Sequence, residues 1–67
     1  MEYQERLLME YTELVSKFNK LECFIKYNKI DKEKEELMNR QLDVMMNYRS
    51  ILEQRILLEM KKGINEN

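Results

Sequence analysis

Apolar side chains recur in the first part of the chain at alternating intervals of four and three residues. They occupy Leu7, Tyr11, Leu14, Phe18, Leu21 and Ile25. The mean interval of 3.5 residues nearly matches the 3.6 residues of a helical turn, so these side chains share one stripe of an amphipathic helix. Leu8, Val15 and Phe24 widen the stripe. The pattern predicts a helix over about residues 2–28.

The apolar stripe is interrupted between Ile25 and Leu37. Continuing the same intervals lands only on polar residues, from Asn28 to Asn39. Asn28 can adopt the left-handed conformation that commonly ends a helix, and Asp31 can cap the start of a new one. The interruption therefore predicts a turn over about residues 28–31 between two antiparallel helices, rather than one continuous rod.

The second helix, predicted over about residues 32–62, carries two parallel apolar rows. One row is Leu37, Val44, Ile51 and Leu58, and the other is Met38, Met45 and Leu52. Two rows are wider than one antiparallel neighbour can cover, so we expect the hairpin to self-associate. The expected interface between protomers consists of Leu37, Val44, Met45, Ile51, Leu52 and Leu58. Gly63 can supply a left-handed residue that ends the helix, which leaves residues 63–67 as a frayed tail.

Length and composition agree with a small helical unit. The chain has 67 residues with one Gly, no Pro and no Trp, which is too short for two domains and too poor in turn residues for a β-rich fold. Chains of this size usually need a disulfide, a metal or self-association to supplement a small core. Cys23 is the only Cys and His is absent, so self-association remains. We therefore expect an all-α fold, an antiparallel two-helix hairpin assembling into a helical homo-oligomer.

The composition also argues against several function classes. Without His the commonest general base is missing, and the only Gly lies too near the C-terminus for a phosphate-binding loop. We expect no enzyme activity, no cofactor and no metal. A formal net charge of −1 argues against nucleic acid as a partner. No apolar run approaches the ~18 residues of a membrane span, and the acidic start lacks the layout of a signal peptide, so we expect a cytoplasmic protein.

Aromatic and basic side chains near the apolar stripes are candidates for ligand binding. Tyr rings can stack on a base while Lys or Arg pairs with a phosphate. The candidate residues are Tyr11, Lys26, Tyr48, Arg49 and Arg55. The alternative interpretation is structural. An antiparallel hairpin puts Leu7 opposite Leu52 and Tyr11 opposite Tyr48, and polar residues on such a seam fix its alignment.

The order of these residues resembles that of a known family. The run Lys20-Leu-Glu-Cys-Phe-Ile25 is followed by Leu37-Met38, Gln41-Leu42, Met45, Tyr48, Ile51-Leu52 and Arg55-Ile56. Over about residues 5–56 the chain resembles a family of short phage and prophage proteins, named after crAss-like phages and of unassigned function. The resemblance implies a phage-encoded, non-enzymatic helical hairpin that acts in the host bacterial cytoplasm.

The expected shape is also similar, more distantly, to the helical-hairpin viral sponges. These small oligomers sequester the cyclic nucleotide signals of bacterial immunity, which implies an anti-CBASS, counter-defence role. The competing class is a coiled-coil adaptor or inhibitor that lays an apolar helix face on a host or virion protein. A closed oligomer with small-molecule pockets favours the sponge, whereas a Met-rich exposed surface on a monomer or dimer favours the adaptor.

Overall fold

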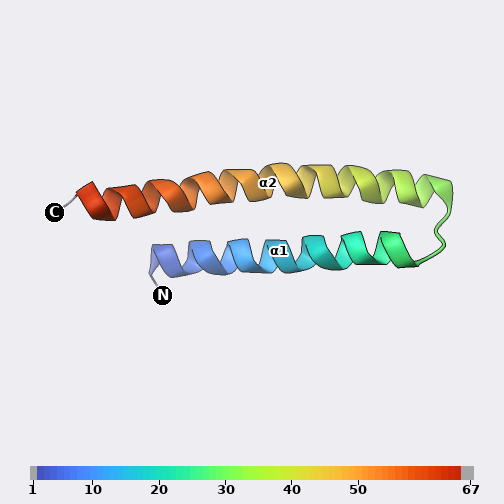
Figure 1. Ribbon diagram of the computed structural model, residues 1–67, viewed down its shortest axis with the longest axis horizontal. Coiled ribbons are helices and arrows are strands. Elements are labelled where there is room, and N and C mark those ends of the chain that lie inside the picture. Colours follow the sequence, from blue (N-terminus) through green and yellow to red (C-terminus); the bar gives the residue numbers. More distant parts are fainter. Residues whose placement is uncertain (1, 66–67) are drawn as a thin grey trace.

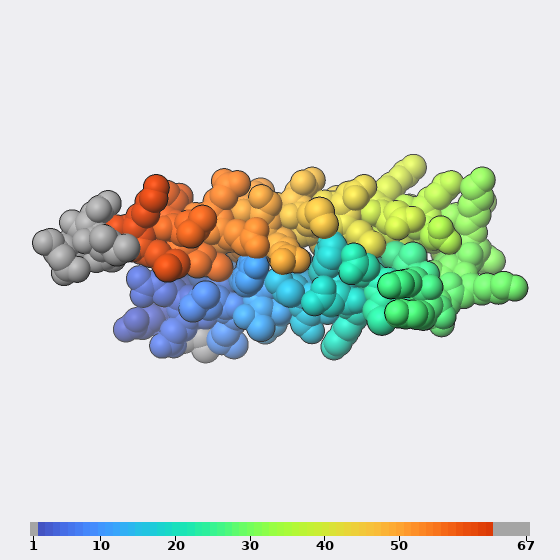
Figure 2. Space-filling model, in the orientation of Figure 1, coloured from blue at the N-terminus to red at the C-terminus, as the bar shows by residue number. Residues whose placement is uncertain are grey.

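A computed structural model describes residues 2–65 as two antiparallel helices joined by a short turn (Figure 1). Helix α1 spans Tyr3–Tyr27 and helix α2 spans Lys32–Asn65. The hairpin measures 54 × 19 × 15 Å, and the two helices pack against each other along its length (Figure 2). The predicted all-α hairpin is confirmed. Within the described residues, neither helix is long and apolar enough to cross a membrane.

The turn lies where the interrupted stripe predicts it, but its backbone differs from the prediction. Asn28 is extended, with φ −126° and ψ 147°, so the expectation of a left-handed Asn28 is wrong. Its side-chain Nδ2 instead donates a hydrogen bond of 2.9 Å to the carbonyl of Phe24, one of the carbonyls that the last helical turn leaves without a partner. At the start of α2 the carbonyl of Asp31 accepts a hydrogen bond of 2.8 Å from the main-chain N–H of Glu35, as an N-cap residue should.

The apolar stripe of α1 forms one side of the core, as its periodicity predicts. Leu7, Leu14 and Phe18 are buried, and Leu52 of α2 has no exposed surface at all. Around Leu7, Leu14 and Leu52 pack three partly buried side chains, Tyr11, Met45 and Ile56. Leu7 and Leu52 lie in the same cluster, in agreement with the antiparallel register expected from a turn over residues 28–31.

Only one of the two apolar rows of α2 turns toward α1. Together with the buried or half-buried residues on the same side of α2 it forms the inner stripe, which consists of Met38, Leu42, Met45, Arg49, Leu52, Ile56 and Glu59. The intervals again alternate between four and three, so the inner stripe is a heptad seam inside the hairpin. Leu52 is fully buried in the hairpin and has no surface left for a second protomer, so the prediction that it contacts one is wrong. Met45 is only partly buried against the same core, so its contact with a second protomer stays a prediction.

The remaining row of α2, here called the outer row, points sideways from the contact with α1. It consists of Leu37, Val44, Ile51 and Leu58, which are 64%, 67%, 55% and 64% exposed. Each lies one position before an inner-stripe residue, and one position rotates a side chain by about 100° around a helix axis. A single neighbouring helix cannot cover both directions, so the hairpin leaves this row without a partner.

Helix α2 continues beyond its expected end near residue 62. It runs to Asn65 and includes Gly63, so the expected helix stop at this glycine is wrong. A glycine inside a helix costs only ~1 kcal/mol relative to alanine, which does not force a helix to end. The last two residues of the expected frayed tail, 66–67, lie outside the described residues.

Candidate functional site

The hairpin separates the five candidate ligand residues instead of gathering them. Tyr11 and Arg49 lie at one lateral edge with Glu53, whereas Arg55 lies at the other edge with Tyr3. Residues two apart in a helix point about 160° away from each other, which is why Glu53 and Arg55 serve opposite edges. We refer to these as the Glu53 edge and the Arg55 edge.

At the Glu53 edge, one carboxylate joins the two helices. The hydroxyl of Tyr11 donates a 2.7 Å hydrogen bond to Oε2 of Glu53, and Nε of Arg49 lies 3.6 Å from the same oxygen. The ion pair is partly solvated, and such pairs contribute only ~0–1 kcal/mol. Glu53 offsets the charge of Arg49, so this edge is better suited to holding α1 against α2 than to binding an anion.

At the Arg55 edge, a guanidinium lies beside an aromatic ring. Nη2 of Arg55 donates a 2.8 Å hydrogen bond to the hydroxyl of Tyr3, and Cζ lies 5.9 Å from the centroid of the Tyr3 ring. This hydrogen bond is the main reason that the pKa of Arg55 is raised above its ordinary value. In the described part of the chain, no carboxylate lies within 4.0 Å of the Arg55 guanidinium. The guanidinium of Arg55 has five N–H donors, so beyond the hydrogen bond to Tyr3 it keeps further donors available for a ligand.

A hollow of about 330 Å³ opens beside this pair. Its walls are Tyr3, Arg6, Leu7, Glu10 and Arg55. Two guanidinium groups and one carboxylate line the hollow next to an aromatic ring, and the carboxylates of Glu10 and Glu59 both act on Arg55 by raising its pKa. Arginine is well matched to phosphate because its planar fork can donate two parallel hydrogen bonds. The hollow thus combines groups that recognise an organic phosphate.

Tyr48 and Lys26 lie apart from this hollow. Tyr48 precedes Arg55 by two helical turns, ~10 Å along the axis, on the same side of α2, and its side chain is 40% exposed. Lys26 is near the hairpin tip, where Nζ lies 5.4 Å from the centroid of the Tyr27 ring. A single hairpin therefore cannot bring Lys26 and Arg55 onto one small ligand.

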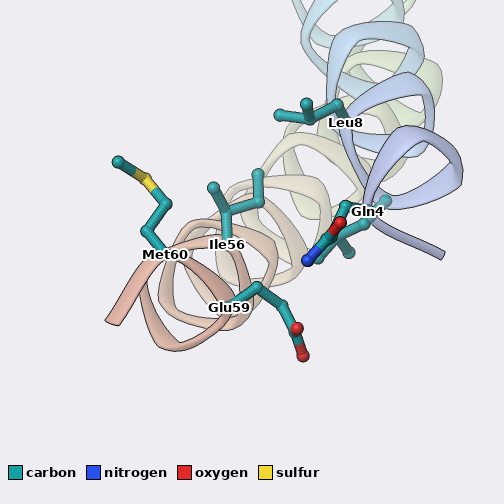
Figure 3. A pocket seen from close by; sticks show the side chains of 6 residues that line it. Gln4, Leu8, Ile56, Glu59 and Met60 are labelled. Carbon is teal, nitrogen blue, oxygen red and sulfur yellow. The ribbon is translucent and has the colours of Figure 1, made fainter. Parts of the chain in front are cut away.

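The Glu53 edge also carries an apolar hollow of about 230 Å³ near the open end of the hairpin. Figure 3 shows Gln4 and Leu8 of α1 across this space from Ile56 and Met60 of α2, with Glu59 at its rim. Two polar side chains border it, but it has no basic group. The hollow suits an apolar side chain of a partner better than a charged ligand.

Four charged or aromatic residues of these edges were not among the sequence candidates, namely Tyr3, Arg6, Glu10 and Glu53. The spacing of Arg49 and Glu53, four residues apart on one helix, is a recognisable ion-pair signal. The hairpin register that places Leu7 opposite Leu52 also brings Tyr3 near Arg55. No signal in the sequence singles out Arg6 from the other exposed basic residues.

The fold and its surface define a class: a small antiparallel helical hairpin with one uncovered apolar row and a basic, aromatic edge beside it. Within the described residues no cluster of three or more His, Cys, Asp or Glu side chains could hold a metal ion. The chain belongs to the Sequestin family, whose family model matches residues 1–58. No curated protein and no solved structure matches the chain.

Proposed function

We propose that this protein is a non-catalytic sponge, a helical homo-oligomer that binds and sequesters nucleotide signalling molecules, with cyclic nucleotides of bacterial immunity as the ligand class. The family description, Sequestin, supports a sequestering role. The observation that carries the proposal is the Arg55 edge. Its hydrogen-bonded Arg55 and Tyr3 adjoin a hollow with Arg6, beside the uncovered outer row of α2.

The chemistry of a nucleotide matches the groups at this edge. A base offers a planar face that Tyr3 or Tyr48 can stack on, and a phosphate offers paired oxygens to Arg6 or Arg55. Sequestration requires only tight binding, so it needs none of the nucleophiles or general bases that the sequence lacks. Arg55 is charged because an arginine guanidinium is not deprotonated in proteins, and its hydrogen bond to Tyr3 raises its pKa further.

Self-association supports the binding function for an electrostatic reason. In one hairpin the hollow is open to water, where an arginine–phosphate pair contributes little. A second copy packed along the outer row of α2 would exclude water from the adjoining edge, and the same charge pair is several times stronger in a less polar medium. We therefore place the ligand between protomers. The resemblance to short phage proteins supports a counter-defence role in the cytoplasm of an infected bacterium.

The test is ligand binding by wild type and matched arginine variants. A panel of cyclic di- and trinucleotides is screened by thermal shift, because a ligand that binds only the folded state raises the melting temperature. Positive ligands are then titrated calorimetrically into wild type, Arg55→Ala and Lys20→Ala. Lys20 is an exposed basic residue of α1 that belongs to neither edge nor the outer row, so its variant controls for the loss of one charge. We expect Arg55→Ala to lose binding while Lys20→Ala retains it. Absence of binding by wild type to the whole panel would refute the ligand class.

A second function, a coiled-coil adaptor that inhibits or links a host or virion protein, is favoured by a different observation. Four further apolar side chains of the hairpin are about half exposed: Met9, Met46, Leu57 and Met60, at 48%, 55%, 58% and 59%. Methionine adapts to irregular partner surfaces. An adaptor would bind no nucleotide and would lose its protein partner when Met46 or Met60 is replaced by a charged residue.

A further inference from the structure

The uncovered side of α2 carries a second heptad seam with an internal symmetry. The outer seam, an extension of the outer row, is Lys34, Leu37, Gln41, Val44, Tyr48, Ile51, Arg55, Leu58 and Lys62. Its intervals alternate between three and four throughout. The pattern has the same chemistry in both directions from Tyr48: an aliphatic residue, a long polar residue, another aliphatic residue and a lysine. Every one of these side chains is exposed except Arg55, which is half-buried.

We propose that the outer seam is the contact between two copies of this chain, packed with their α2 helices antiparallel about a twofold axis that passes near Tyr48. The proposal rests on the homo-oligomer of the proposed function and specifies its face and orientation. In such a self-complementary contact Leu37 meets Leu58 of the second copy, and Val44 meets Ile51. From Leu37 to Leu58 the contact extends ~32 Å along the helix axes.

The antiparallel orientation follows from the charges that flank the seam. The positions on its outer side are Glu33, Arg40, Asn47, Gln54 and Lys61. An antiparallel pair places Glu33 of one copy beside Lys61 of the other at both ends. A parallel pair would place Arg55 against Arg55 within the seam, and such a like-charge contact is unfavourable. Lys34 and Lys62 at the ends of the seam face a lysine in either orientation, so they favour neither. Antiparallel helices also bring the acidic first turn of each α2 next to the basic last turn of the other.

The helix α1 offers no comparable seam to a second copy. Its larger exposed apolar side chains are Tyr3, Leu8, Met9, Phe24 and Tyr27, which gather at its two ends. Between them α1 presents no run of exposed apolar residues at alternating intervals of three and four. The outer seam of α2 is therefore the surface of the described chain that has the periodicity a helical partner requires.

The twofold contact also completes the ligand site. Gln41 and Arg55 are equally spaced from Tyr48, so Arg55 of one copy lies beside Gln41 of the other. Each Arg55 edge then receives an amide from the second copy, in addition to its own Tyr3 and Arg6. Two equivalent sites result, one on each side of the axis, with the Tyr48 rings between them. The site of a single hairpin is accordingly incomplete.

Cross-linking of single-cysteine variants tests the orientation. In a Cys23→Ser background, Leu37→Cys and Leu58→Cys are prepared separately and co-expressed, then treated with a short bis-maleimide cross-linker. We expect the co-expressed pair to form covalent dimers, while neither variant does so alone, because equivalent ends lie far apart. Tyr48→Cys should cross-link with itself at the axis. Ser50→Cys, which is exposed but off the seam, is the matched control and should not.

Three results would overturn the proposal. The first is that Leu58→Cys alone cross-links as efficiently as the co-expressed Leu37→Cys and Leu58→Cys pair. The second is that this co-expressed pair does not cross-link although the oligomer is intact. The third is that wild type sediments as a monomer. If cysteine at the aliphatic positions weakens assembly, Gln41→Cys with Arg55→Cys repeats the experiment at polar positions. Nucleotide binding is measured separately on wild type. A cross-linked twofold pair that binds no nucleotide refutes the sponge alone, and a monomer that binds nucleotide refutes the twofold contact alone.

Discussion

Replacing Val44 and Ile51 together with aspartate should separate the protomers while leaving the pairing of α1 with α2 in place. Both side chains belong to the outer row, 67% and 55% exposed in the hairpin, and neither contributes to the core around Leu52. The substitution therefore acts on the contact with a second copy. In an antiparallel pair it also brings four carboxylates together near the twofold axis.

The magnitude follows from the exposed fractions. Complete burial of a Val or Ile side chain stabilises by ~1.5–3 kcal/mol. Because somewhat more than half of each side chain is exposed in the hairpin, a second copy can supply ~1–2 kcal/mol per side chain. A twofold pair contains four of these side chains, so the double variant loses ~4–8 kcal/mol of association free energy before the carboxylate desolvation is counted. Even the lower figure weakens dimerisation about a thousandfold.

Sedimentation velocity over a dilution series measures this change, with far-ultraviolet circular dichroism as the record of helix content. Leu57→Asp is the matched control, because Leu57 is exposed to a similar extent, 58%, but lies off the outer row. We expect the control to assemble like wild type and the double variant to sediment as a monomer. Helicity of the variant should fall at low concentration, since a core this small is marginal on its own. Equal sedimentation of wild type and double variant, or equal dissociation by the control, would refute the reasoning.

Three further predictions concern the core, the Glu53 edge and the charge of Arg55. Leu52→Ala should reduce the free energy of unfolding by ~2–5 kcal/mol in urea titrations, because it opens a cavity at the most buried side chain; a loss no larger than that of Leu57→Ala, which is exposed and off the outer row, would contradict the core assignment. Tyr11→Phe should cost ~0.5–1.5 kcal/mol by removing the hydrogen bond to Glu53, and a Glu53→Gln background should shrink that loss. Because the hydrogen bond to Tyr3 raises the pKa of Arg55 from a value already far above neutrality, the guanidinium is protonated throughout the neutral range. The nucleotide affinity measured by calorimetry should therefore not change across the neutral pH range through titration of Arg55. If binding is lost on mild alkalinisation, a group other than Arg55 must carry the interaction with the phosphate.

The sequence alone determined that the chain forms two helices and where it reverses. Helical periodicity is a local property, and the loss of apolar residues between Ile25 and Leu37 is visible without any structure. The conformation of Asn28 was not predictable in the same way. Both a left-handed residue and an extended residue with a side-chain hydrogen bond can end a helix, and asparagine supports either.

Only the tertiary structure decided which apolar row of α2 faces α1. Ile51 and Leu52 are neighbours of nearly equal hydrophobicity, yet one is 55% exposed and the other is fully buried. The rotation of α2 about its own axis depends on how Leu7, Leu14 and Phe18 pack into it, which is a property of two surfaces together. The pairing of Tyr3 with Arg55, across most of the chain, likewise depends on the hairpin register. The sequence therefore supplied candidate residues for a site, and the packing of the two helices separated those that share an edge from those that do not.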